Sequence, residues 1–153
     1  MSENTTSTAS FNVRRDHFQK ALDGAVELSP ATSMLGWNVQ EYDSEAGTIT
    51  VRFDAKAEFC NAGGIIHGGF LAAMLDDTLA PALGVMVDEN QYTPTIELKL
   101  NYLRPAKVGP IIGKANVIRR GRNIGFVEGR LEDEAGQVLV TATGTFMIVT
   151  MKE

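Results

Sequence analysis

The residues best suited to chemistry lie in one stretch near the middle of the chain. A glycine-rich loop that begins at Asn61 leads into His67-Gly68-Gly69, and an apolar stretch with helical content carries Asp76. Backbone N–H groups at a helix start have no intrahelical partner and lie at the positive end of the helix dipole, so they favour a negative oxygen. Gly68 has no side chain, so a ligand can approach this backbone closely. The stretch therefore predicts an anion-stabilising N–H group at Gly68 and a carboxylate farther along the same helix.

The spacing of these residues predicts a site shared by two chains. In a helix, the nine residues from His67 to Asp76 span about 13.5 Å along the axis and roughly 180° around it. One copy of the helix cannot easily bring His67, Gly68 and Asp76 to one reacting atom, whereas two antiparallel copies can. We therefore expect a dimer with the site at its interface.

Asp76 has small apolar neighbours at helical spacing, namely Ala72, Ala73, Leu79 and Ala80. A carboxylate in such surroundings is desolvated and its pKa rises, which suits a general base or a nucleophile near neutral pH. The alternative is a carboxylate at a dimer rim that has no chemical role. Asp77 has similar neighbours, and its environment alone does not separate it from Asp76.

The pattern Asn-x5-His-Gly-Gly-x6-Asp, followed by strand-rich sequence, resembles the hotdog-fold acyl-CoA thioesterases of the phenylacetate-pathway type over roughly residues 30–150. The resemblance implies hydrolysis of an acyl-CoA thioester to a free acid and coenzyme A. It implies Asp76, rather than Asp77, as the general base or as a nucleophile that forms an anhydride. It also implies that the Gly68 N–H of the neighbouring subunit is the oxyanion donor. We expect a homodimer as the minimal active unit, and the sequence leaves open whether the whole assembly is that dimer or, as we favour, a homotetramer. No metal or redox cofactor is implied.

Three further residues receive roles from the resemblance, each with a plainer alternative. Asn61 would orient the water or the thioester, although Asn is also a common turn residue before two glycines. His67 would position the loop or the substrate rather than act as a base, and a purely structural histidine is an equal alternative. Thr95, aligned through Tyr102 and Pro105, matches a Ser/Thr that hydrogen-bonds the attacking water, but threonine is also common in strands simply for packing.

Arginines cluster on one turn of this otherwise acidic chain, at Arg119, Arg120 and Arg122. Their planar, multidentate donors suit the phosphates of coenzyme A. A solvated hairpin tip explains the cluster equally well. Arg104 and Lys107 are weaker candidates for the same phosphates.

Composition excludes several classes of protein. The length of 153 residues suits one domain, which we place at residues 13–153 after a disordered leader at 1–12. A net charge of −5 argues against a broad nucleic-acid surface. No apolar run is long enough to span a membrane, and the first ten residues lack the features of a signal peptide. Cys60 is the only cysteine, so no internal disulfide forms and a cytoplasmic location is expected. No Cys/His cluster has metal-ligand spacing.

Hydrophobic periodicity predicts an α+β fold, in which a long central helix packs on an antiparallel sheet of about six strands. The resemblance implies that this is the hotdog fold, with the sheet wrapped around the helix. We expect a first helix over 14–28 that stops before Pro30, and a hairpin of strands near 37–41 and 48–53. The central helix begins near Gly68 and continues towards Val85, with a kink rather than an end near Pro81. Strands follow at 95–102, 111–118, 125–132 and 138–151, and their spacing predicts consecutive hairpins.

Two other functions fit part of the pattern. A non-catalytic acyl-CoA-binding protein would keep the loop and pocket without turnover, and saturable binding without release of coenzyme A would identify it. An acyl hydratase or dehydratase relies on a His paired with an acidic residue in a different motif, so the His-Gly-Gly helix start favours the thioesterase.

Overall fold

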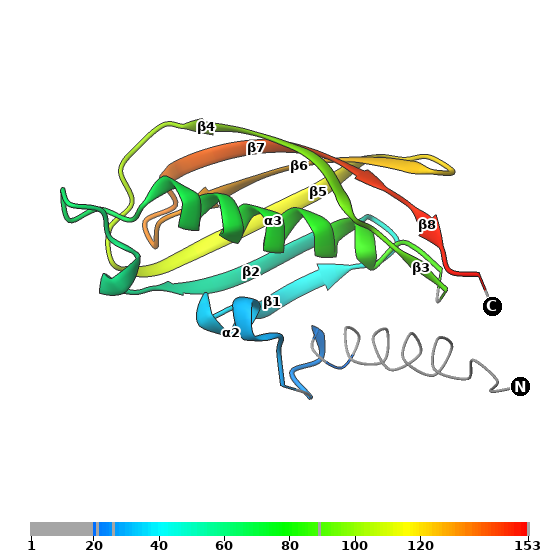
Figure 1. The fold of residues 1–153 in the computed structure, drawn as a ribbon, viewed down its shortest axis with the longest axis horizontal. Coiled ribbons are helices and arrows are strands. Elements are labelled where there is room, and N and C mark those ends of the chain that lie inside the picture. The colour runs from blue at the N-terminus through cyan, green and yellow to red at the C-terminus, as the bar shows by residue number, and fades with distance from the viewer. Residues whose placement is uncertain (1–19, 21, 26, 89, 153) are drawn as a thin grey trace, which may run out of the picture.

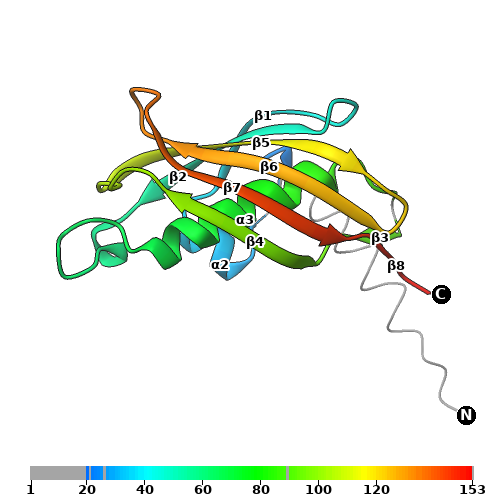
Figure 2. The same ribbon diagram turned by 90° about the horizontal axis from the view of Figure 1, so that it is seen from above.

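The computed structural model describes residues 20, 22–25, 27–88 and 90–152. A six-stranded antiparallel sheet curves around one long helix, α3 (Gly68–Gly84), which lies in front of the strands in Figure 1 and under the sheet in Figure 2. The predicted α+β hotdog architecture is confirmed. The expected leader at 1–12 lies outside the described residues.

The elements follow the order α2 (Pro30–Met34), β1 (Asn38–Asp43), β2 (Thr48–Ala55), the 3-10 helix η1 (Ala57–Phe59), α3, β3 (Gln91–Tyr92), β4 (Thr95–Tyr102), β5 (Gly109–Arg120), β6 (Ile124–Glu132), β7 (Val138–Met147) and β8 (Val149–Thr150). The predicted central helix continues through Pro81, as expected. Within the described part of the chain, no helix combines the length and the apolar character needed to cross a membrane.

α3 packs on the sheet through buried side chains on the helix and glycines on the strands. The fully buried residues of α3 are Met74, Leu75, Thr78, Leu79, Ala82 and Leu83. Gly113 on β5 faces Thr78 so closely that any side chain there would collide with the threonine hydroxyl, and Gly125 on β6 faces Leu83 in the same way. Thr78 Oγ1 donates to Met74 O at 2.7 Å, so its buried hydroxyl is satisfied. This packing fixes one side of α3 and leaves the other side facing outward.

The order of strands in the sheet corrects the expectation of consecutive hairpins. The order is β1-β2-β5-β6-β7-β4, so β4 pairs with β7 at the edge and not with β5. The pairs β5–β6 and β6–β7 are hairpins, as predicted, and every pairing is antiparallel. The hairpin expectation fails at β4 because α3 carries the chain across the sheet from β2 to the far edge. The segment 103–108 then brings the chain back across the sheet, so that β5 pairs with β2.

The N-terminal helix prediction is tested only in part. Lys20 and Leu22 are helical, and most of the predicted helix over 14–28 lies outside the described residues. Pro30 was expected to follow the end of a helix, but it begins one. It occupies the first turn of α2, and Ser29 caps that helix by accepting from Thr32 N. Proline is tolerated at this position because its missing N–H would have no helical partner anyway.

The last predicted strand, over 138–151, is divided in the structure. β7 ends at Met147, and β8 pairs with β3 in a separate two-stranded sheet, which the sequence did not predict. Ile148 N donates to Asn123 O at 2.7 Å, in the turn between β5 and β6. The chain changes partners at this point because the backbone of β7 has passed the end of β6.

Candidate functional site

The start of α3 combines a capping histidine with a backbone N–H that has no acceptor. His67 is the N-cap residue, and its Nδ1 accepts from Gly69 N at 3.0 Å. Because Nδ1 accepts, a neutral His67 carries its proton on Nε2, and that N–H is directed away from the cap. Gly68 N finds no acceptor among the residues that the structure describes. Two donors are therefore available at the positive end of a 17-residue helix.

The loop before this helix is closed by Asn61. The side-chain Oδ1 of Asn61 accepts from Gly63 N at 2.9 Å and from Ile65 N at 3.4 Å. The backbone N–H of Asn61 donates to Ile65 O at 2.8 Å. The side-chain oxygen of Asn61 thus holds the turn. Within the described residues, no hydrogen bond joins Asn61 to Asp76 or Thr95.

The outward side of α3 brings Asp76 and Thr95 together. Thr95, the first residue of the edge strand β4, donates its hydroxyl to Asp76 Oδ1 at 2.8 Å. Asp76 is half-buried and Thr95 is exposed. This contact holds one carboxylate oxygen, while Oδ2 has no donor among the described residues. The carboxylate is therefore oriented and keeps one oxygen open to a ligand or water.

Asp77 is the carboxylate whose ionisation the structure disfavours. Burial raises the pKa of Asp77 to about 6, the nearby hydroxyl of Thr32 in α2 partly offsets this rise, and the charge of Asp76 adds to it. Trp37 Nε1 donates to the backbone oxygen of Asp77 at 2.8 Å. Asp77 therefore faces α2 and the buried Trp37, and its side chain belongs to the packing between these elements and α3.

Tyr102 is a contact of the helix start that sequence reasoning missed. From the far end of β4 its hydroxyl donates to Gly68 O at 2.9 Å. Its ring lies so close that a Cβ on Gly68 would be 3.2 Å from Cζ. In the sequence, Tyr102 continues a strand alternation and helps to align Thr95. No local pattern could indicate a contact across 34 residues.

The candidate phosphate-binding arginines lie at the other end of α3 from Gly68. Arg119 and Arg120 end β5, and Arg122 follows in the turn to β6, where Gly125 packs against Leu83 near the end of the helix (Figure 1). All three arginines are exposed. Within one chain, the structure therefore does not bring them to Gly68.

The two weaker cationic candidates lie at the Gly68 end. The segment 103–108 packs beside the glycine loop, where Ile66 N donates to Ala106 O at 2.9 Å. Arg104 Nη1 donates to Val138 O at 2.6 Å, which holds this guanidinium at the start of β7, and Lys107 is exposed.

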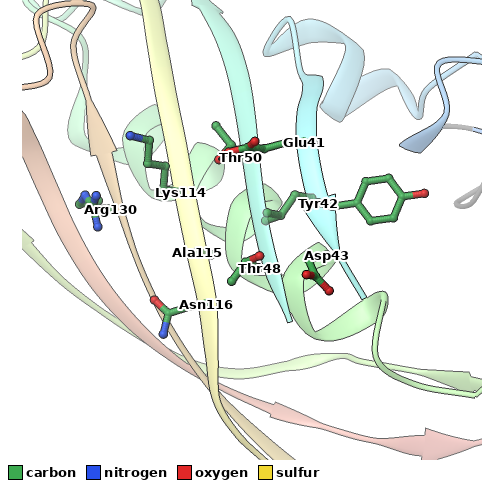
Figure 3. Close-up of a pocket in the computed structure, with 10 residues that line it drawn as sticks. Glu41, Tyr42, Asp43, Thr48, Thr50, Lys114, Ala115, Asn116 and Arg130 are labelled. Carbon is green, nitrogen blue, oxygen red and sulfur yellow. Dashed lines mark hydrogen bonds between the residues drawn. The ribbon is translucent and has the colours of Figure 1, made fainter. Parts of the chain in front are cut away.

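A groove of about 360 Å³ lies on the sheet face that is turned away from α3 (Figure 3). Its charged and polar side chains are Glu41, Tyr42, Asp43, Thr48, Thr50, Lys114, Asn116 and Arg130. Lys114 and Arg130 both pair with Glu132, and Thr50 donates to Glu41 at 3.2 Å. The groove contains none of the predicted site residues, and its two cationic side chains, Lys114 and Arg130, are paired with Glu132.

Comparison with known proteins finds relatives by sequence. A sequence model of the thioesterase superfamily matches residues 63–140. A Saccharolobus solfataricus protein named for an inferred esterase activity is 31% identical, over 75% of this chain and 81% of its own. The medium/long-chain acyl-CoA thioesterase YigI of Escherichia coli is 24% identical, over 78% of this chain and 85% of its own.

A solved structure is similar to this chain in both sequence and fold. A phenylacetic acid degradation-related protein of Ralstonia eutropha JMP134 is 35% identical, covers 85% of this chain and 98% of its own, and superposes with a TM-score of 0.80. The span matched by the superfamily contains His67, Gly68, Asp76 and Thr95. Asn61 lies just before it.

Proposed function

Because this chain belongs to the thioesterase superfamily, we propose that it hydrolyses an acyl-CoA thioester to a free carboxylic acid and coenzyme A. One observation carries the proposal: α3 presents an N–H without an acceptor at Gly68 and a carboxylate, Asp76, oriented by Thr95. The name of the E. coli relative supports acyl-CoA as the substrate class. Coenzyme A enters only as part of the substrate, and the proposal uses no metal or redox cofactor.

The start of α3 would activate the thioester carbonyl. As water adds, the carbonyl oxygen becomes an oxyanion, and the Gly68 N–H would stabilise it with support from the helix dipole. A preorganised donor of this kind contributes about 10²–10³ in rate. The Nε2–H of His67 lies on the same capping residue and would assist as a second donor or position the substrate. Asn61 would hold the loop that presents both groups.

Asp76 would supply the nucleophile. As a general base, it takes a proton from water while the water oxygen bonds to the thioester carbon. Collapse of the tetrahedral intermediate then breaks the C–S bond, and the thiolate of coenzyme A takes up a proton. Alternatively, Asp76 attacks the carbon itself, and water cleaves the resulting anhydride. In both routes the Thr95 hydroxyl orients the carboxylate, so Oδ2 is the reacting oxygen.

Two copies of the chain would complete one site. Gly68 and Asp76 are eight residues apart on α3, about 12 Å along the axis. The outward side of α3 carries small residues at Gly69, Ala73 and Ala80, where a second helix can approach closely. In an antiparallel pair, the start of one helix lies beside the middle of the other. We therefore propose a homodimer as the minimal active unit.

The edge strand supports the same assembly. Ile96 and Tyr102 on β4 are 53% and 55% exposed beside the uncovered side of α3, and β4 has one unpaired edge. An antiparallel dimer would also place the turn with Arg119, Arg120 and Arg122 on the same side as the Gly68 end of the other subunit. There the arginines could bind the phosphates of coenzyme A.

Thiol release from a panel of acyl-CoA esters tests the function. The panel spans phenylacetyl, hydroxybenzoyl, and short, medium and long aliphatic esters. We expect steady release by the wild type and a loss of about 10³-fold in kcat for Asp76→Asn, because a general base is worth about 10²–10⁴. The matched control is Asp77→Asn, which removes the adjacent charge and should stay within a few-fold of wild type.

Two outcomes would contradict the proposal. Saturable binding of the esters without thiol release would identify a binding protein. Full activity in Asp76→Asn with loss in Asp77→Asn would move the base to the neighbouring residue.

A further inference from the structure

The peptide unit between Gly68 and Gly69 is held at both of its polar groups by side chains. Its carbonyl oxygen accepts from the Tyr102 hydroxyl at 2.9 Å, and its N–H donates to His67 Nδ1 at 3.0 Å. These side chains come from different elements, since His67 caps α3 and Tyr102 ends β4. The first peptide of the helix is thus fixed from two directions.

Satisfying a buried polar group does not explain the Tyr102 contact. A carbonyl in the first turn of a helix already accepts an N–H from one turn farther on. The Tyr102 side chain is also exposed enough to give its hydroxyl to water, at 55% relative exposure. The ring nevertheless packs directly over Gly68, where an added Cβ would lie 3.2 Å from Cζ. The absence of a side chain at Gly68 is what admits the ring.

The effect of the contact falls on the N–H group of Gly68. That N–H belongs to the preceding 67–68 peptide, which is joined to the held 68–69 peptide at the Gly68 Cα, so a shift of Gly68 would move both peptides together. An oxyanion donor is effective only when it is aimed at the developing charge before the reaction begins. Tyr102 holds the Gly68 carbonyl through its hydroxyl and lies against Gly68 with its ring, so it restrains the residue from which the donor projects.

We propose that Tyr102 is a positioning residue for thioester hydrolysis, acting through Gly68 to hold the oxyanion donor in place. This inference rests on the proposed function. It gives β4 two tasks on one helix, because Thr95 at its start holds Asp76 and Tyr102 at its end holds Gly68. The strand thereby fixes the base and the donor relative to the same scaffold.

Steady-state kinetics of Tyr102→Phe tests the inference. The variant keeps the ring against Gly68 and removes only the hydroxyl. We expect kcat and kcat/KM to fall together by about 5–10-fold with KM within about two-fold, because an interaction that acts only in the transition state leaves KM unchanged. Tyr92→Phe on β3 is the matched control, and its kinetics should equal those of the wild type.

The outcomes separate this inference from the proposed function. A wild type that releases no thiol overturns both. An active wild type with an equally active Tyr102→Phe overturns the inference alone. Loss of activity in Tyr102→Leu that is fully restored by Tyr102→Phe also overturns it, because the ring would then act only by packing. A higher KM with unchanged kcat in Tyr102→Phe would assign Tyr102 to substrate binding and equally contradict positioning.

Discussion

The pKa values of two carboxyl groups, on different faces of the molecule, are shifted in opposite directions. Burial raises the pKa of Asp77 on α3 to about 6. Burial also acts to raise the pKa of Glu132 at the end of β6, but hydrogen bonds and charge from Arg130 and Lys114 outweigh it and hold that pKa below its usual value. The fold thus opposes the charge of Asp77 and favours the charge of Glu132.

Hydrogen bonding follows the same division. On the outer face of the sheet, Lys114 and Arg130 pair with Glu132, and Asn116 donates to Glu128. On the uncovered side of α3, Gly68 N has no acceptor among the described residues, and Asp76 is held through only one oxygen. The outer face is arranged for stability, whereas the side of α3 keeps groups that a substrate can satisfy.

After the loss of Asp76 itself, removing the free N–H donor of Gly68 should give the largest effect. Gly68 is the first residue of α3, where proline is tolerated, and the extended backbone of His67 suits a following proline. Gly68→Pro deletes the N–H and should lower kcat by about 10²–10³. Gly68→Ala keeps the N–H and isolates the cost of contact with Tyr102. Equal kcat values in the two variants would remove the N–H from the mechanism.

The buried charge of Asp77 should give the next largest effect, on stability. The folded-state pKa is raised from 3.8 to about 6, so the contribution of Asp77 to stability is fully present below pH 3.8 and is lost as the pH rises through 6. Asp77→Asn should therefore be more stable than wild type by roughly 2 kcal/mol at pH 8, and the gap should close near pH 4. Urea unfolding between pH 4 and 8 measures this, with the exposed Asp88→Asn as control. A difference in stability between Asp77→Asn and wild type that does not change with pH would contradict the raised pKa of Asp77.

Removing the hydrogen bond that orients Asp76 should have a smaller effect on the rate. Thr95→Val keeps the shape of the side chain and removes the hydroxyl that binds Asp76 Oδ1. A hydrogen bond to a charged group is worth about 1.5–3 kcal/mol, of which we expect part in the transition state and a fall in kcat of about tenfold. Thr143→Val, on the exposed face of β7, is the control. Unchanged kcat in Thr95→Val would leave Thr95 as an ordinary strand residue.

The outer face should give the smallest effect, and none on catalysis. Because the folded-state pKa of Glu132 is lowered, its stabilising contribution is present above its unfolded pKa and is lost as the pH falls through the folded value. Glu132→Gln should lower stability at pH 7 by about 1 kcal/mol, with a smaller difference in acid and unchanged kcat. Glu128→Gln serves as the exposed control. A fall in kcat for Glu132→Gln would contradict the view that the outer face of the sheet has no part in catalysis.

The sequence predicts the parts of the site that depend on neighbours in the chain. His67 and Gly68 lie at a helix start because a glycine-rich loop meets an apolar helical stretch, and the structure has that boundary there. The position of Thr95 beside Asp76 followed only from the resemblance. It depends on where α3 delivers β4, and no local pattern contains that information.

The contacts that sequence reasoning missed join distant segments. Tyr102 reaches Gly68, and α2 with Trp37 covers Asp77, only because the curved sheet folds these segments around α3. The same long-range geometry placed β4 at the sheet edge, where hairpin spacing alone predicted a neighbour of β5. Pro30 was misassigned because proline follows helix ends and also opens helices.

The most direct test of the account is complementation between two inactive chains. Asp76→Ala and Gly68→Pro chains, each carrying a different tag, are co-expressed, and the mixed dimers are purified and assayed for thiol release. If each site takes Asp76 from one subunit and Gly68 from the other, a mixed dimer has one intact site and about half the wild-type activity. Mixed dimers as inactive as either parent would show that both groups act within one chain, and would contradict the shared site.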